Sequence, residues 1–117
     1  MSGAVSYLSG LSAEAAVADH YARRGLTIAA RRWRGTAGEI DLVARQGEAL
    51  VFIEVKQARD FARAAERLSP RQIARICSAA AEFAGGEPRG QLTEMRLDLA
   101  MVDGCGRISV LENVTLH

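Results

Sequence analysis

Residues 38–56 read GEIDLVARQGEALVFIEVK and carry the strongest structural signal in the chain. Two runs rich in Ile, Leu and Val, residues 39–45 and 50–56, flank a turn at residues 46–48. Branched and large apolar residues on both sides of a glycine-containing turn are typical of a β-hairpin. We therefore predict two adjacent antiparallel strands here.

The sequence before this hairpin predicts one helix and one strand. An alanine-rich helix is expected over residues 13–24, with Ser12 as its N-cap and Gly25 as the residue that ends it. Residues 26–34 then read as an extended segment that leads into the hairpin.

The sequence after the hairpin predicts a second helix and two strands. The run Ser69-Pro70-Arg71-Gln72 has the pattern of a capping box, so a helix should begin there and end at Gly85-Gly86. Its apolar residues recur at helical spacing, which leaves Arg71 and Arg75 on the solvated side. Residues 57–68 read as a mobile or partly helical connector, and alternating apolar residues predict strands over 95–101 and 107–112.

These elements predict one α/β domain over residues 1–117. Its mixed β-sheet is flanked by helices in the order α-β-β-β-α-β-β. Length and composition agree, because 117 residues that are 49% hydrophobic can bury a core without disulfides or a structural metal. The two cysteines carry no framework, which fits a reducing compartment. Neither a basic signal-peptide start nor a run of eighteen apolar residues is present, so we expect a cytoplasmic protein with no membrane association.

The predicted hairpin brings two acids and an amine together. Side chains alternate along a strand, so Glu54 and Lys56 project from the same face. A turn of two or four residues sets Asp41 opposite Glu54 on the neighbouring strand. Like charges in cross-strand positions destabilise a sheet, and a hard divalent cation such as Mg²⁺ would compensate them. We therefore expect Asp41 and Glu54 to hold a metal ion, and Lys56 to orient or deprotonate an attacking water.

A plainer interpretation of Glu54 and Lys56 is a same-face ion pair without chemistry, which is the commoner role of a single Glu-x-Lys sequence. Their position at the end of the most hydrophobic strand favours function, because surface pairs are less expected there. Lys56 is also the one lysine among fifteen basic residues. A lysine suits a site beside a nucleophile because its pKa falls readily on desolvation, whereas arginine stays protonated.

Glu14 offers a third carboxylate. It shares a helical stripe with Val17, Ala18 and Tyr21, so the face expected to pack on the sheet carries an acid. Two interpretations stay open: an acid of the same site, or a first-turn residue that complements the helix dipole.

Arginine-rich stretches lie on both sides of the acidic hairpin. Residues 21–38 contain five Arg and no acid, and residues 56–75 contain six basic residues against two acids. Guanidinium groups bind phosphate, so these stretches could hold a nucleic-acid backbone, although a solvated face or a protein-binding surface would have the same composition. Trp33 could stack on a base or pack in the core. His20 and His117 have no ligand spacing, and we assign them no chemistry.

The two strands also carry a family resemblance. Residues 38–44 and 50–56 resemble the GEIDLIA…LVFVEVK signature of the YraN-like proteins of the UPF0102 family. These proteins are similar to the PD-(D/E)XK nuclease superfamily, which includes archaeal Holliday-junction resolvases. The resemblance covers most of the chain and implies a restriction-endonuclease-like core. It further implies Asp41 and Glu54 as metal ligands, Lys56 as the catalytic lysine and Glu14 as the helix acid of that site.

The expected function is therefore that of a metal-dependent endonuclease. It would use Mg²⁺ or Mn²⁺ to hydrolyse phosphodiester bonds of nucleic acid, with DNA as the expected substrate. The alternative is a non-catalytic nucleic-acid-binding or adaptor protein that keeps the fold. A homodimer is compatible with a small nuclease that cuts two strands, although no segment specifies an interface. The residues expected to contact nucleic acid are Arg31, Arg32, Arg34, Arg59 and Arg63.

Overall fold

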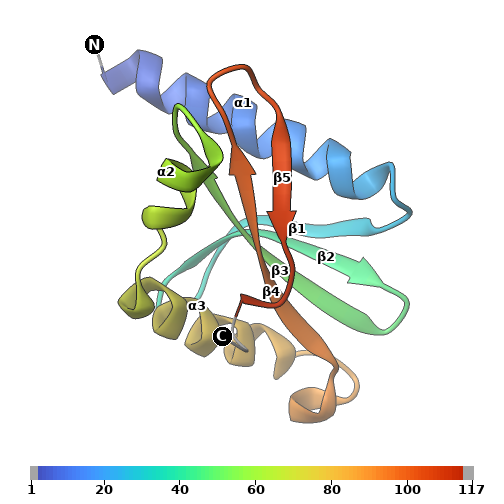
Figure 1. Cartoon of the computed structure of the whole chain (residues 1–117). Coiled ribbons are helices and arrows are strands. Elements are labelled where there is room, and N and C mark those ends of the chain that lie inside the picture. The colour runs from blue at the N-terminus through green and yellow to red at the C-terminus, as the bar shows by residue number, and fades with distance from the viewer. Residues whose placement is uncertain (1–2, 115–117) are drawn as a thin grey trace.

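The predicted hairpin forms the middle of a five-stranded mixed sheet (Figure 1). The computed structural model describes residues 3–114, with side chains described from residue 10 onward. In chain order the elements are α1 (Gly3–Ala22), β1 (Thr27–Arg34), β2 (Glu39–Gln46), β3 (Ala49–Gln57), α2 (Phe61–Glu66), α3 (Pro70–Ala84), the 3-10 helix η1 (Gly90–Leu92), β4 (Met95–Val102) and β5 (Ile108–Leu111).

The strands lie in the sheet in sequence order, from β1 to β5. Neighbouring strands are antiparallel except β3 and β4, which are parallel. A parallel pair needs a long crossover, and here α2, α3 and η1 form it. The α/β class and the predicted order of elements are confirmed, with α2 and η1 as short additions inside the crossover.

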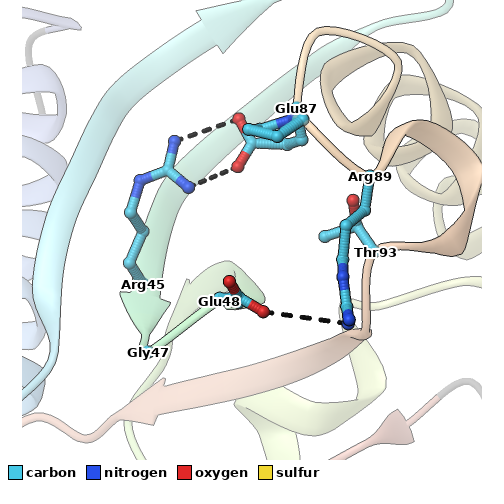
Figure 2. Close-up of a pocket in the computed structure, with 7 residues that line it drawn as sticks. Arg45, Gly47, Glu48, Glu87, Arg89 and Thr93 are labelled. Carbon is cyan, nitrogen blue, oxygen red and sulfur yellow. Dashed lines mark hydrogen bonds and ion pairs between the residues drawn. The ribbon is translucent and has the colours of Figure 1, made fainter.

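The turn end of the β2–β3 hairpin is held against the segment that follows α3. Gln46 pairs with Ala49, so the turn has two residues, and Gly47 adopts the positive φ of 61° that such turns require. Arg45 makes a two-pronged ion pair with Glu87 around a pocket of about 150 Å³ (Figure 2). These contacts fix one end of β2 and β3, whereas the candidate site lies at the other.

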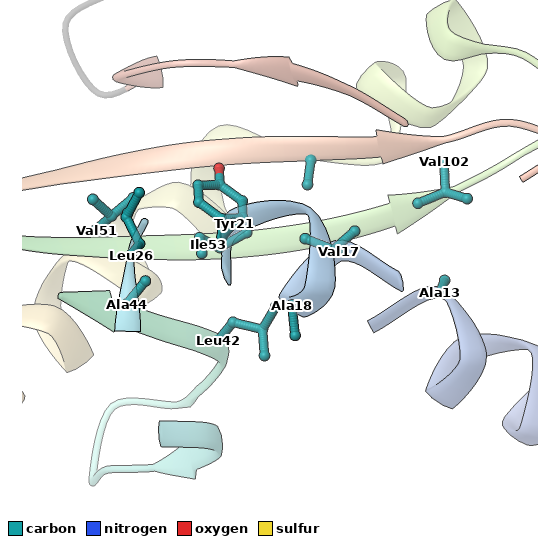
Figure 3. Packing of buried hydrophobic residues seen from close by; sticks show 11 residues of the cluster. Ala13, Val17, Ala18, Tyr21, Leu26, Leu42, Ala44, Val51, Ile53 and Val102 are labelled. Atoms are coloured by element: carbon teal, nitrogen blue, oxygen red, sulfur yellow. The ribbon is translucent and has the colours of Figure 1, made fainter. Parts of the chain in front are cut away.

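The sheet is covered on both faces (Figure 1). On one face, α1 packs its buried Val17, Ala18 and Tyr21 against the apolar side chains of β2, β3 and β4 (Figure 3). On the other face, α3 covers Leu50 and Phe52 of β3, and α2 covers the end of β4. Alternate residues of β3 therefore face different helices, as the period of a strand requires.

Two local expectations need correction. The first helix begins at Gly3, so Ser12 lies inside α1 and is not its N-cap. Ala and Leu are good helix formers and an interior Ser or Gly costs only about 0.5–1 kcal/mol, which lets the helix run through. The expectation of a partly helical connector is confirmed, because residues Phe61–Glu66 form α2. The Asp60 side chain caps this helix by accepting a hydrogen bond from the backbone N–H of Arg63 at 2.8 Å. Cys77 falls at the helical spacing of the apolar residues of α3, yet it is exposed.

The capping box at the start of α3 is confirmed. Ser69 accepts from the N–H of Gln72 at 3.1 Å, and the Gln72 side chain accepts from the N–H of Ser69 at 3.2 Å.

Among the helices of residues 3–114, none is long and apolar enough to cross a membrane.

A fully buried carboxylate joins three segments of the chain. Asp98 of β4 is 0% exposed, and it accepts a hydrogen bond from the Tyr21 hydroxyl of α1 at 2.8 Å. It also binds the guanidinium of Arg96 at 3.0 Å and the backbone N–H of Asn113 at 3.0 Å. A buried carboxylate is tolerated when its lone pairs are satisfied in this way, so Asp98 ties α1 and the segment after β5 to the sheet.

Removal of the Tyr21 hydroxyl tests this role. Tyr21→Phe is expected to lower the free energy of unfolding by about 1.5–3 kcal/mol, because it deletes one hydrogen bond to a charged group. Asp19→Asn on the same helix is the control, since its ion pair with Arg23 is exposed and should contribute less than about 1 kcal/mol. Urea denaturation measures both, and an equal effect of the two substitutions would contradict the role of Asp98.

Candidate active site

Asp41 and Glu54 lie where the β2–β3 ladder ends. The backbone pairing runs from Gln46 and Ala49 to Leu42 and Ile53, so the two acids occupy the next opposed positions. The predicted opposition is confirmed. The Asp41 carboxylate accepts a hydrogen bond from the backbone N–H of Val55 at 2.8 Å, so a side chain of β2 satisfies a β3 donor beyond the backbone ladder.

Glu54 is a buried acid with a second acid beside it. Its residue is 8% exposed, and the Lys56 amine lies 3.5 Å from its Oε2 atom, which confirms that the two side chains share a face. The pKa of Glu54 is raised to about 9, first by burial and then by hydrogen bonding to Asp41 and by the charge of Asp41. Lys56 opposes the rise without cancelling it. At neutral pH Glu54 therefore keeps its proton and donates it toward Asp41.

Glu14 approaches Asp41 from α1. The helix begins at Gly3, so Glu14 lies well inside it, and the interpretation as a first-turn dipole residue is wrong. Burial raises the pKa of Glu14, and the charge of Asp41 adds to this effect, while Arg32 and Arg31 oppose it. Asp41 thus raises the pKa of both other acids and is the carboxylate that connects them.

The three acids are not gathered around one point. Glu54 follows Phe52 on the face that α3 covers, whereas Glu14 belongs to the helix on the opposite face. Among the side chains described from residue 10 to 114, no three His, Cys, Asp or Glu converge closely enough to hold a metal ion between them. Asp41 and Glu54, as neighbours, are the residues that could hold one.

Glu54 opens onto a cleft of about 210 Å³ between the start of β2 and the first half of α3. Gly38 and Glu39 line one side, and Gln72, Arg75 and Ile76 of α3 line the other.

The turn that precedes β2 is anchored to the same helix. Glu82 of α3 accepts hydrogen bonds from the backbone N–H and the hydroxyl of Thr36, at 2.8 and 3.1 Å. A Cβ at Gly35 would lie only 2.5 Å from Oε2 of Glu82, so glycine permits this approach. The cleft is thus built by two segments that are distant in sequence.

Three of the five predicted phosphate-binding arginines lie near the acids. Arg31 and Arg32 are close enough to Glu14 to lower its pKa, and Arg32 lies opposite Asp41 with a positive φ of 47°. Such a conformation is uncommon outside glycine and concentrates at functional sites. Arg34 makes an ion pair at 3.0 Å with Glu39, which lines the cleft.

The contacts of Arg59 and Arg63 are with residues outside the group of acids. Arg63 binds Asp60 at the start of α2, and the backbone of Arg59 accepts from the N–H of Gly104 at 3.1 Å. Trp33 packs edge-to-face on Phe83 with ring centroids 5.2 Å apart, which supports its core interpretation. His20 contacts the ring of Tyr21, and His117 lies outside the described residues.

Gln72 and Arg75 line the cleft, although the sequence pattern does not mark them as site residues. The capping box assigns Gln72 to the start of the helix, and helical spacing places Arg75 on the solvated side. Arg75 is indeed exposed, but it lines the cleft with Glu54. The spacing of Gln72 and Arg75 does contain a signal, because residues three apart on a helix are neighbours. Both lie beside the buried stripe at Ile76, which places them at the border between α3 and the sheet.

The pH dependence of unfolding tests the environment of Glu54 in the metal-free protein. Its pKa is raised from an ordinary 4.5 to about 9, so the folded state binds this proton more tightly than the unfolded chain does. The stability that the group contributes is therefore complete below its unfolded pKa and is lost as the pH rises through its folded pKa. Glu54→Gln mimics the protonated acid, so its stability relative to wild type should grow by more than about 1.4 kcal/mol between about pH 5 and pH 9.

Urea denaturation in EDTA measures this difference. Glu39→Gln is the matched control, because Glu39 lines the same cleft but is exposed, and its relative stability should stay constant over that range. Parallel profiles for wild type and Glu54→Gln would contradict the raised pKa.

Comparison with known proteins identifies the family of this chain. The model of the "Uncharacterised protein family UPF0102" matches residues 13–102. A UPF0102 protein of Cereibacter sphaeroides is 58% identical over 113 residues, which cover 97% of each chain. Similar proteins from Ruegeria pomeroyi and Dinoroseobacter shibae are 56% and 47% identical, over 98% and 97% of this chain and 94% and 85% of their own. The chain therefore belongs to the UPF0102 family.

Proposed function

We propose that this protein is a metal-dependent endonuclease that hydrolyses phosphodiester bonds of nucleic acid, with DNA as its substrate. The observation that carries the proposal is that Glu54, which lines a cleft, has Asp41 and Lys56 as its immediate neighbours. A strongly perturbed acid in a cleft is typical of functional sites, because catalytic groups need pKa values shifted to suit their task.

The donor set fits a hard divalent cation. Asp41 and Glu54 offer oxygen ligands, and Lys56 alone does not offset the charge that both would carry when ionised. Mg²⁺ and Mn²⁺ prefer oxygen ligands, and Mg²⁺ commonly takes one or two carboxylates with waters and substrate phosphate, so two protein ligands suffice. Asp41 and Glu54 would hold the ion, with Glu14 as a further acid beside Asp41. When bound, the cation would offset negative charge that develops on the phosphoryl oxygens.

Lys56 has the position to act on a water. Its side chain is 18% exposed, and its amine lies 3.5 Å from Glu54, so the amine is beside the buried carboxylate and is partly accessible to solvent. A compact ammonium with three donors can hold an attacking water and offset charge in the transition state. Arg31 and Arg32 would bind the substrate backbone on the α1 side of the same acids.

Metal titration of Asp41→Asn tests the ligand assignment. Asparagine keeps an oxygen that can accept from the Val55 N–H, so the fold should survive, whereas the ionised ligand is lost. We expect isothermal calorimetry to detect Mn²⁺ binding by wild type and a loss of at least about tenfold in affinity for the variant. Glu39→Gln removes an exposed acid from the same cleft and should bind Mn²⁺ as wild type does. Equal binding by all three proteins would refute the assignment.

Lys56→Arg separates catalysis from ion pairing. The substitution preserves the charge, so a structural ion pair predicts little change, whereas the planar guanidinium should not replace the amine beside the water. We expect cleavage to fall by about 10²-fold or more while Mn²⁺ affinity is kept. A panel of branched and linear DNA substrates with Mn²⁺ measures the rates.

The same panel distinguishes the other functions. DNA binding by wild type without cleavage of any substrate would favour the non-catalytic nucleic-acid-binding protein. No DNA affinity even at low salt would instead favour a protein partner for the arginine-rich surface.

A further inference from the structure

We propose that Arg75, together with the side-chain amide of Gln72, binds a phosphodiester group next to the scissile bond, so that α3 forms the substrate-facing wall of the site. This inference rests on the proposed function and adds to it a residue and a direction for the bound strand. It arises from the cleft that joins α3 to Glu54.

The charges around the cleft leave Arg75 as its available cation. Glu39 is engaged by Arg34 at 3.0 Å, and Glu54 is approached by Lys56 at 3.5 Å. Arg75, by contrast, makes no hydrogen bond or ion pair within residues 10–114, and it is exposed to solvent. An arginine that lines a concave surface without an acidic partner is suited to an external anion, and its planar fork matches phosphate oxygens.

Gln72 adds neutral donors beside this cation. Its Oε1 atom accepts from the N–H of Ser69 in the capping box, which fixes the orientation of the side-chain amide. Its Nε2 donors make no hydrogen bond within residues 10–114, and the residue lines the cleft. The amide is therefore held in place by its oxygen while its nitrogen is available to a ligand.

The geometry of the cleft brings this pair close to the acids without competing for them. Gly38 packs against α3, and a Cβ placed there would lie 3.9 Å from the Cβ of Arg75. The start of β2, which leads directly to Asp41, thus runs beside Arg75. A phosphodiester bound by Arg75 and Gln72 would adjoin a second one at Glu54, because all three residues line one cavity of about 210 Å³. Asp41 lies next to this cavity through its hydrogen bond with Glu54.

Arg71 provides a matched control on the same helix. It is exposed like Arg75 and lies one turn earlier, but it does not line the cleft. General electrostatic attraction predicts equal effects of the two charges, whereas a built site predicts a larger effect of Arg75.

The experiment measures binding of fluorescein-labelled DNA by fluorescence anisotropy in EDTA, over a range of salt concentrations, for wild type, Arg75→Gln and Arg71→Gln. We expect Arg75→Gln to weaken binding about tenfold and to reduce the salt slope by about one, and Arg71→Gln to weaken it less than about threefold. Calorimetry should show unchanged Mn²⁺ binding in Arg75→Gln, and in cleavage assays its KM should rise more than its kcat falls.

The outcomes separate this inference from the proposed function. If wild type binds and cleaves DNA but the two arginine variants behave alike, the role of Arg75 is refuted and the nuclease stands. If Arg75→Gln loses Mn²⁺ affinity as well, its effect is structural and the inference again fails. If wild type neither binds nor cleaves DNA, the proposed function and the role of Arg75 are both refuted.

Discussion

The pairing of Gln46 with Ala49 is the constraint on which the candidate site depends. Because side chains alternate along a strand, a slip of one residue would turn Glu54 and Lys56 to the face covered by α1 and bring Val55 to the cleft. The two-residue turn at Gly47 and the ion pair between Arg45 and Glu87 hold this register from the far end of the hairpin. The geometry of the acids is thus set at the opposite end of the same two strands.

Asp98 and Glu54 are both buried acids of the sheet, but their surroundings differ. Asp98 is satisfied by donors from three segments, and its role is to join them. Glu54 is equally part of the sheet, but its nearest polar neighbours include a second carboxylate, and its pKa rises accordingly. A buried acid whose lone pairs are satisfied fits a structural role, whereas a raised pKa beside a second carboxylate is typical of functional sites. The contrast within one protein supports a structural role for the first and a functional role for the second.

Helix α3 belongs to the site as much as the strands do. Glu82 holds the turn before β2, and Gln72 and Arg75 line the cleft beside Glu54. The capping box at Ser69 starts the helix, and it also orients the side chain of Gln72, which lines the cleft. The crossover between the parallel strands β3 and β4 is what brings this helix back over the sheet.

Local signals were sufficient for the strands, the capping box and the opposition of Asp41 to Glu54. Each of these follows from strand period, turn chemistry or capping pattern within a few residues. The start of α1, the use of Asp98 as a hub and the place of Arg75 beside Glu54 did not follow, because each depends on segments that meet only after the chain has crossed over the sheet. Periodicity shows which residues share a face of their own element. It does not show what lies opposite that face, which long-range packing alone establishes.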